Sequence, residues 1–424
     1  MGRYIYGIDF GTTNSAISIL DTATNEIVKT FNESSLIFFP KPEQRKDPVT
    51  YFIGKEAVSR YVDSNMNGRF MKSIKRVLPR QGFTETLVYT QKYKAEDLIC
   101  IILKYLKDKA DQFVKEEVKR AVFGRPVVFD ENPVNDQLAQ DRLLAAAKLA
   151  GFEEVAFQME PIAAAFTYER TITKEELVLV ADLGGGTSDF TLMRLGPNKL
   201  KLANRQADIV GQGGIYVGGD NFDSAIMWEK GTPHFGKGLT YKDFDTTVEL
   251  PKSFFLNITS WEKMNFFDNR RLQNALDKFD YLTGRKPTFK NMISLIRNNL
   301  GYAVFQSIEQ AKIGLSEQDQ VVFNVECKDI EINEPISMEE FSTTIIGDDV
   351  AKIRTYLLEF LETLNIKPNA VDALFMTGGT SLVKPIRSFI VDLFGKEVVK
   401  SGDNFNSVAN GLAYSHVLFY NATP

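Results

Sequence analysis

The sequence Gly7-Ile8-Asp9-Phe10-Gly11-Thr12-Thr13-Asn14-Ser15 decides the predicted fold, because Val178–Asp189 (VLVADLGGGTSD) repeats its pattern in the second half of the chain. In each copy an apolar run typical of a strand ends in an aspartate, followed by glycines and a threonine. A strand, a glycine turn and a hydroxyl form a hairpin whose backbone N–H groups can surround a polyphosphate. The aspartate can hold a metal ion or its waters beside that phosphate. Two such hairpins facing each other would hold one nucleotide from both sides.

A glycine turn between two strands is the simpler interpretation of either copy alone. Two copies half a chain apart, each after a buried strand, favour an internal duplication instead, and a duplication is information about the whole fold. We therefore expect an α/β protein built from two similar halves.

The composition places the chain among ordinary two-lobed globular proteins. Its 424 residues exceed what one hydrophobic core organises. The net charge of −5 and the lack of a basic block argue against nucleic-acid binding. Two cysteines and two histidines, far apart, exclude a disulfide framework, a zinc motif and a Ser-His-Asp triad. We see neither a signal peptide nor an apolar run that could span a membrane, so we expect a cytoplasmic protein without a membrane partner.

The apolar periodicity predicts alternating strands and helices in both halves. The predicted helices cover residues 95–118, 135–150, 160–170, 301–315 and 348–364, with another beginning near 407, and the predicted strands cover 121–129, 152–157, 177–182 and 373–377. We expect a first lobe at 1–172 and a second at 173–424, with an inserted subdomain at about 224–308.

The predicted insertion is aromatic and irregular, and core packing explains most of its aromatic residues, which include Phe254, Phe255, Trp261, Phe266 and Phe267. The segment Gly231–Lys237 has the spacing of a phosphate-binding P-loop. However, Gly238 occupies the place of the required serine or threonine and no strand precedes it, so we reject that interpretation.

Together these motifs resemble the ATPase domain shared by actin, sugar kinases and DnaK-type heat-shock chaperones, and the DnaK type is the most similar. The resemblance covers nearly the whole chain. It rests on Ile8–Ser15, Glu160–Ala165, Asp182–Thr187 with Asp189, Val217–Asp223, the series Glu309, Lys312 and Ser316, and Gly378–Thr380. It implies a two-lobed actin-like ATPase fold, with duplicated ribonuclease-H-like halves and inserted subdomains.

The resemblance also implies a site for ATP or ADP with Mg²⁺. It assigns catalytic roles to Lys75, Glu160, Asp182 and Thr187, and places Mg²⁺, through water, beside Asp9 and Asp182. The nucleotide-binding residues it implies are Asp9, Gly11, Thr12, Thr13, Asn14, Gly184, Gly185, Gly186, Gly218, Gly219, Asp220, Glu309, Lys312, Ser316, Gly378, Gly379 and Thr380. A solvated lysine in a basic turn remains the alternative for Lys75, and a helix N-terminal charge remains the alternative for Glu160.

Phosphoryl transfer to water depends mainly on positioning and on cations near the phosphate. The sequence does not identify an arginine for this role, so we expect slow turnover, which suits a switch.

Three departures from the family pattern affect what can be expected of this chain. Leu382 occupies the place of an arginine that stacks on adenine in the family. The interval between Asp223 and Glu309 is longer than in typical chaperones. The sequence also ends after the ATPase motifs, so we expect no peptide-binding domain, as in the shortened YegD-type DnaK-like proteins, whose Gly-Arg-Pro-Val strand resembles Gly124–Val127.

Three functions are compatible with these residues. The first is a slow Mg²⁺-dependent ATPase that acts as a conformational switch and signals to an unidentified protein partner or co-chaperone. The second is a small-molecule kinase of the same superfamily, with a substrate pocket in the insertion. The third is a non-catalytic, actin-like scaffold, which the retained Asp9, Lys75, Glu160, Asp182 and Thr187 disfavour.

Overall fold

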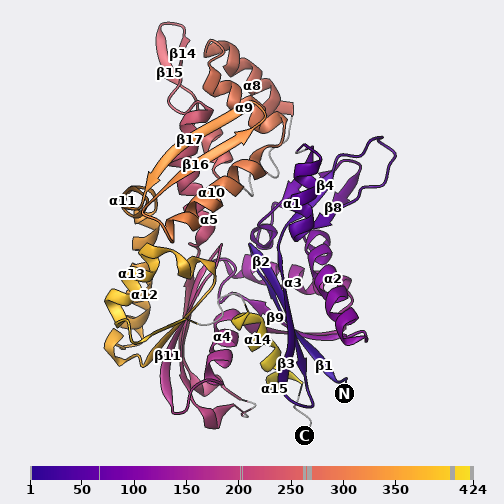
Figure 1. The fold of residues 1–424 in the computed structure, drawn as a ribbon, viewed down its shortest axis with the longest axis vertical. Coiled ribbons are helices and arrows are strands. Elements are labelled where there is room, and N and C mark those ends of the chain that lie inside the picture. Colours follow the sequence, from indigo (N-terminus) through magenta and orange to yellow (C-terminus); the bar gives the residue numbers. More distant parts are fainter. Residues whose placement is uncertain are drawn as a thin grey trace.

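Two five-stranded mixed sheets lie side by side in the lower half of the molecule as viewed in Figure 1. The computed structural model describes residues 2–65, 67–200, 202, 204–260, 264, 270–401 and 406–420. The strand order of the first sheet is β10 (Glu154–Met159), β9 (Arg120–Arg125), β1 (Tyr4–Phe10), β2 (Asn14–Asp21) and β3 (Glu26–Ser34). The order of the second is β19 (Val399–Ser401), β18 (Ala373–Thr377), β11 (Glu176–Leu183), β12 (Ser188–Leu195) and β13 (Ile209–Ile215).

The two sheets have the same topology. In each, a central hairpin (β1–β2 or β11–β12) is antiparallel and extends to a third antiparallel strand, β3 or β13. On its other side the first hairpin strand pairs in parallel with β9 or β18, which pairs in parallel with β10 or β19. The duplication predicted from the two glycine motifs is therefore present in the fold.

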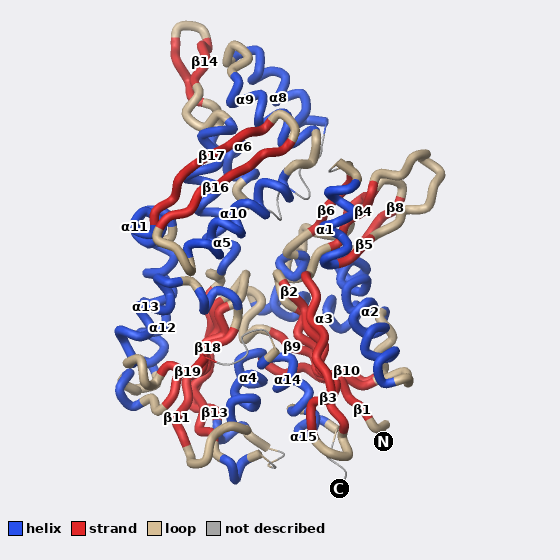
Figure 2. Tube along the Cα trace, viewed as in Figure 1, coloured by secondary structure: helices blue, strands red, loops and turns tan. Residues whose placement is uncertain are grey.

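Helices cover the sheets and fill the space between them (Figure 2). Their bounds are α1 (Gly54–Asp63), α2 (Ala95–Val114), α3 (Pro133–Leu149), α4 (Glu160–Glu169), α5 (Gly219–Ile226), α6 (Lys252–Ile258), α8 (Arg270–Leu282), α9 (Pro287–Arg297), α10 (Gly301–Leu315), α11 (Met338–Glu340), α12 (Gly347–Thr363), α13 (Lys384–Phe394), α14 (Ser407–Tyr414) and α15 (His416–Phe419). The remaining strands are β4 (Ile37–Pro40), β5 (Phe52–Ile53), β6 (Gly68–Met71), β7 (Thr86–Val88), β8 (Gln91–Tyr93), β14 (Thr240–Asp243), β15 (Thr246–Glu249), β16 (Gln320–Cys327) and β17 (Ile330–Ser337).

Helix α14 follows the second sheet in sequence but packs on the first. It contacts β1, β2 and α4. Its Asn410 Oδ1 accepts hydrogen bonds from Ser18 Oγ on β2, at 2.6 Å, and from Thr30 Oγ1 on β3, at 2.9 Å. The chain thus passes from the first half to the second through α4 and returns through α14.

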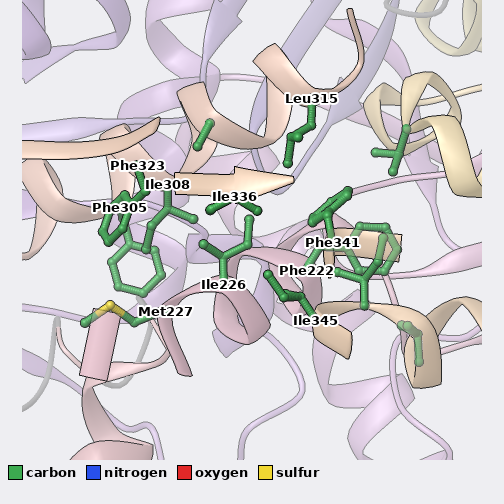
Figure 3. Packing of buried hydrophobic residues seen from close by; sticks show 14 of the residues in the cluster. Phe222, Ile226, Met227, Phe305, Ile308, Leu315, Phe323, Ile336, Phe341 and Ile345 are labelled. Atoms are coloured by element: carbon green, nitrogen blue, oxygen red, sulfur yellow. The ribbon is translucent and has the colours of Figure 1, made fainter. Parts of the chain in front are cut away.

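The part of the second half that lies above its sheet in Figure 1 shares one continuous hydrophobic core with that sheet, and Figure 3 shows a portion of this core. Residues from α5 and the turn after it, α10, β16, β17 and the turn after α11 pack there, namely Phe222, Ile226, Met227, Phe305, Ile308, Leu315, Phe323, Ile336, Phe341 and Ile345. The packing therefore continues beyond the predicted insertion at 224–308, through β17. The division into lobes at 172 and 173 remains our proposal.

This upper part also contacts the first half. Tyr302 on α10 stacks on Phe70 of β6, with ring centroids 3.8 Å apart, and meets Tyr61 of α1 edge to face at 5.3 Å. The Tyr61 hydroxyl donates to the carbonyl oxygen of Asn299, at 3.0 Å. An aromatic contact therefore joins the two halves above the space between the sheets.

Most predicted elements exist, with shifted ends. The helix expected at 95–118 ends at Val114, because Lys115 adopts a left-handed conformation with φ of 60°. The strand expected at 121–129 ends at Arg125, before a proline that cannot donate to a sheet. The rejected P-loop segment forms irregular helical turns and does not follow a strand. In the insertion, Phe255 is buried and Phe254 partly buried, whereas Trp261, Phe266 and Phe267 lie outside the described residues.

Candidate functional site

A cavity of about 380 Å³ lies where the turns of the two central hairpins face each other. Most of the residues predicted to bind nucleotide line it: Asp9, Gly11, Thr12, Thr13, Asn14, Lys75, Glu160, Asp182, Gly184, Gly185, Gly186, Thr187, Gly219, Asp220, Glu309, Lys312, Gly378, Gly379 and Thr380. The matched topology of the two sheets explains this convergence, because it directs both hairpin turns toward the space between the sheets.

The two hairpin turns approach each other closely at Gly185 and Gly186. A Cβ atom at Gly185 would lie 2.9 Å from Thr13 Oγ1, and one at Gly186 would lie 3.4 Å from Thr12 Oγ1. A side chain at Gly185 would therefore occupy the space between the loops. Such a cradle of backbone N–H and hydroxyl groups fits a phosphate group.

The third glycine turn supports the second hairpin. Gly378 has φ of +81°, which favours glycine, and lies against the backbone of Leu183. Thr380 Oγ1 donates to the carbonyl oxygen of Gly184, at 2.7 Å. Residues 378–380 therefore form one wall of the cavity and hold the second phosphate loop in place.

Lys75 and Glu160 form an ion pair on the floor of the cavity. Lys75 belongs to a short 3₁₀ turn, Ile74–Val77, and Glu160 is the first residue of α4. The distance from Nζ to Oε1 is 2.7 Å, and the two side chains are only 11% and 8% exposed. This burial argues against a solvated lysine, the alternative considered for Lys75. Glu160 does begin a helix, but its carboxylate is engaged by Lys75.

Buried or half-buried carboxylates lie near this pair. Burial, then the charge of Glu160, raises the pKa of Asp9 above its ordinary value. The same causes raise the pKa of Asp182 well above its ordinary range. Burial raises the pKa of Asp189 to about 7, although its hydrogen bond with Thr187 acts in the opposite direction. Burial lowers the pKa of Lys75, but the negative charges of Glu160 and Asp9 outweigh that effect and raise it.

An excess of buried negative charge is suited to a divalent cation. Within the described residues, no three acidic, histidine or cysteine side chains are grouped so that they could ligate a metal directly. The arrangement therefore fits a cation held through water beside Asp9 and Asp182, and it fits direct ligation less well.

A second set of ion pairs lines the wall contributed by α5 and α10. Lys312 Nζ lies 2.7 Å from Asp223 Oδ1 and donates to the carbonyl oxygen of Gly219, at 3.3 Å. Glu309 Oε2 lies 2.6 Å from Lys72 Nζ, whose side chain is 7% exposed. Glu309 and Lys312, the two residues predicted to contact adenosine, are therefore already paired with other charged residues. Lys72, the partner of Glu309, comes from the first half.

Two of the predicted nucleotide-binding residues do not line the cavity. Ser316 lies just beyond the end of α10. Gly218 lies beneath the second phosphate loop, where a Cβ atom would meet the carbonyl oxygens of Gly184 and Gly185. The residues after it support that loop, since Asp220 N donates to the Gly185 oxygen at 2.8 Å.

Several lining residues were not identified from the sequence. They are Ser15, Ala16, Asn32, Arg76, Pro126, Phe129, Tyr216 and Ile313, with Leu382 noted only as a departure. Arg76 lies 3.6 Å from Asp220 and over the ring of Tyr216, with 5.8 Å to its centroid. The structure thus places an arginine in the cavity, where the sequence identified none. Its position next to Lys75 was the available signal.

Among the residues that the structure describes, no helix is long and apolar enough to cross a membrane.

Comparison with known proteins agrees with this geometry. A family model described as "Hsp70 protein" matches residues 48–232 and 289–420. The chain is 26% identical over 423 residues to the chaperone protein DnaK of Thermosipho melanesiensis, covering 97% of this chain and 58% of that protein. It is 27% identical over 337 residues to DnaK of Mycoplasmopsis agalactiae, covering 75% and 51%. It is 33% identical over 230 residues to DnaK of Mycoplasma mobile, covering 53% and 34%.

The chain therefore spans little more than half the length of the curated relatives it matches. Its paired five-stranded sheets have the actin-like ATPase fold that the sequence led us to expect. Because the family model matches well over half of its residues, the chain belongs to the Hsp70 family and contains that family's nucleotide-binding domain.

Proposed function

We propose that this chain binds ATP with Mg²⁺, hydrolyses it slowly and uses the difference between ATP and ADP as a conformational switch. The observation that supports this most directly is the buried Lys75–Glu160 pair between two glycine hairpins, among carboxylates whose pKa values are raised. Hsp70-family membership supports the choice of ATP and ADP. The small exposed fraction of the pair argues for a role inside the site.

Each part of the cavity has a role in this proposal. Hydroxyl and N–H groups of Thr12, Thr13 and residues 184–187 donate to phosphate oxygens. Asp9 and Asp182 accept hydrogen bonds from water around Mg²⁺, which supplies positive charge beside the phosphates. Glu309 and Lys312 border the nucleoside.

The reaction needs a water molecule held in line with the terminal phosphate. Lys75 Nζ can donate one N–H to the phosphate while it donates another to Glu160 Oε1. Either Glu160 or Asp182 orients this water by accepting a hydrogen bond from it. Arg76 adds a second positive charge to the same cavity. Its ion pair with Asp220 partly offsets the positive charge that Arg76 could offer the phosphates, which agrees with slow turnover.

The partner is proposed only as a class. Because the chain covers 58% of the Thermosipho protein, the activity of a whole chaperone is not transferred to it. A switch requires a receiver, and we propose a protein that distinguishes the ATP-bound from the ADP-bound arrangement of the two halves.

Calorimetric titration with ATP, ADP and GTP in the presence of Mg²⁺, followed by single-turnover hydrolysis, tests the proposal. We expect micromolar binding of ATP and ADP and slow hydrolysis, both lost in Asp182→Ala. Tight binding without hydrolysis would favour the scaffold. Hydrolysis that becomes fast only with an added small molecule, which is itself phosphorylated, would favour the kinase. Failure to bind any nucleotide would refute all the nucleotide-dependent functions.

A further inference from the structure

The segment that carries Lys75 has little regular structure of its own. After β6 ends at Met71, the chain forms one short 3₁₀ turn, Ile74–Val77, and then continues irregularly to β7. Ser73, just before the turn, has φ of 58°, a left-handed conformation uncommon for residues other than glycine. A turn of this length does not hold its own shape, so the surrounding structure must fix the position of Lys75.

One side chain outside the cavity holds the far end of this segment. Arg142, on α3, donates from Nη1 to the carbonyl oxygens of Val77, Leu78 and Arg80, at 3.1, 2.9 and 3.0 Å. Its Nη2 donates to the carbonyl oxygen of Phe83, at 2.7 Å. Four carbonyl groups within seven residues therefore converge on a single guanidinium, whose rigid, planar set of donors can satisfy several acceptors at once.

The near end is held from the opposite side of the cleft. Ser73 Oγ donates to Asp220 Oδ2, at 3.2 Å, and Lys72 pairs with Glu309. Apolar residues anchor the turn between its two ends, with Ile74 4% and Val77 2% exposed. The segment that carries Lys75 is thus held at both ends, by Arg142 of α3 after the turn and by Asp220 and Glu309 of the second half before it.

We propose that Arg142 is a positioning residue for Lys75. It holds the carbonyl groups that follow the turn, so that Nζ reaches both Glu160 and the terminal phosphate. This inference rests on the proposed ATPase function. Displacement of a catalytic group by about 1 Å can reduce a rate about 100-fold. A loosened turn should therefore slow hydrolysis while leaving nucleotide affinity almost unchanged, since the cradle of the two hairpins does not depend on Arg142.

A merely structural role makes a different prediction. If Arg142 only joined α3 to the loop, its removal would lower the melting temperature, and the folded fraction would hydrolyse ATP at the normal rate. The two roles are separated by measuring the single-turnover rate well below the melting temperature, per mole of protein that binds ATP.

The variants are Arg142→Ala and Arg142→Lys, with Arg60→Ala as the matched control. Arg60 lies on the exposed face of α1, 53% exposed, and pairs only with Glu56 within its own helix among the ion pairs of the described residues. We expect Arg142→Ala to reduce kcat at least about tenfold with a change in ATP Kd below about threefold. We expect Arg142→Lys to be intermediate, because an ammonium cannot reach four carbonyl groups, and Arg60→Ala to match the unchanged protein.

Added guanidinium ion provides the decisive test. At millimolar concentration it should restore part of the rate of Arg142→Ala, because the four carbonyl groups remain to bind it, and it should not restore Lys75→Met. An unchanged kcat in Arg142→Ala, no recovery of its rate with guanidinium, or a loss of ATP affinity equal to the loss of rate would overturn the proposal. If the unchanged protein binds no ATP or does not hydrolyse it, the proposed function fails, and that outcome is distinct from a failure confined to the Arg142 variants.

Discussion

Asp189 connects the two halves at the nucleotide site, and its ionisation should contribute to the pH dependence of stability. Its side chain is 1% exposed. One carboxylate oxygen accepts a hydrogen bond from Thr187 Oγ1, at 2.6 Å, and the other accepts one from the backbone N–H of Val127, at 3.1 Å. The first partner belongs to the second phosphate loop and the other follows β9 of the first sheet. Asp189→Asn removes the charge and leaves one acceptor oxygen in place of two.

The sign of the effect follows from the raised pKa. Folding raises the pKa of Asp189 from 3.8 to about 7, chiefly through burial, so the unfolded chain loses this proton at lower pH than the folded chain. The contribution of Asp189 to the free energy of unfolding is therefore fully present below about pH 4 and is lost as the pH rises to about 7. Each unit of the pKa difference between the folded and unfolded states corresponds to about 1.4 kcal/mol of stability, which gives about 4 kcal/mol over the whole interval. For a chain of this length, that corresponds to about 4 °C in melting temperature.

Asp189→Asn should reduce the pH dependence of stability by the share due to Asp189, while the shares due to Asp9 and Asp182 remain. The lost hydrogen bond lowers stability by about 1–3 kcal/mol at every pH, whereas the cost of ionisation disappears. Between pH 4 and pH 7.5, the melting temperature of the variant should therefore rise by about 4 °C relative to that of the unchanged protein. Scanning calorimetry of nucleotide-free protein, at constant ionic strength, measures the difference.

Asp108→Asn is the control for this experiment, since Asp108 is 51% exposed and pairs with Lys104 on the surface of α2. Its melting curve should follow that of the unchanged protein at each pH. Parallel pH dependences for Asp189→Asn and the unchanged protein would refute the assignment of the raised pKa to Asp189. In the same variant we expect hydrolysis to fall at least about tenfold, because Thr187 loses its fixed orientation.

Three further outcomes are expected at the cavity. Lys75→Met should lower the single-turnover rate at least about 100-fold and change ADP affinity by less than about threefold; an equal loss of both would contradict a catalytic role. Gly185→Ala should weaken ATP binding at least about tenfold by calorimetry, because its methyl group would lie 2.9 Å from Thr13 Oγ1. Leu382 and Ile313 are exposed aliphatic residues that line the cavity. Leu382→Ala should therefore weaken ATP binding about fivefold and leave the binding of inorganic tripolyphosphate unchanged. Equal effects on both ligands would place Leu382 away from the base.

The sequence was sufficient to predict the features that depend on local patterns. An aspartate followed by glycines and threonine defines a hairpin within about ten residues, so both central hairpins could be identified without knowledge of their surroundings. The predicted helix at 301–315 matches α10, because an apolar stripe of period 3.6 is also local. The end of α2 was missed, since no glycine marks the left-handed residue Lys115.

The rest of the site depends on contacts between distant segments. Lys72 and Glu309 are 237 residues apart, and neither has a local pattern that identifies its partner. Arg76 and Tyr216 likewise reach the cavity only because the two halves pack together. Arg142 could not be singled out among the charges of α3, because its partners are backbone carbonyl groups with no sequence signature.

The return of the chain through α14 has a consequence for how the molecule can be divided. A protease cut between the halves, near residue 172, would break one covalent connection. It would leave Asn410 bound to Ser18 and Thr30, and α14 packed against β1 and α4. We therefore expect the two fragments to migrate together on a sizing column and to separate only in denaturant. The halves resemble each other as duplicated folds, yet α14 of the second half packs on the sheet of the first, so we expect neither fragment to fold alone.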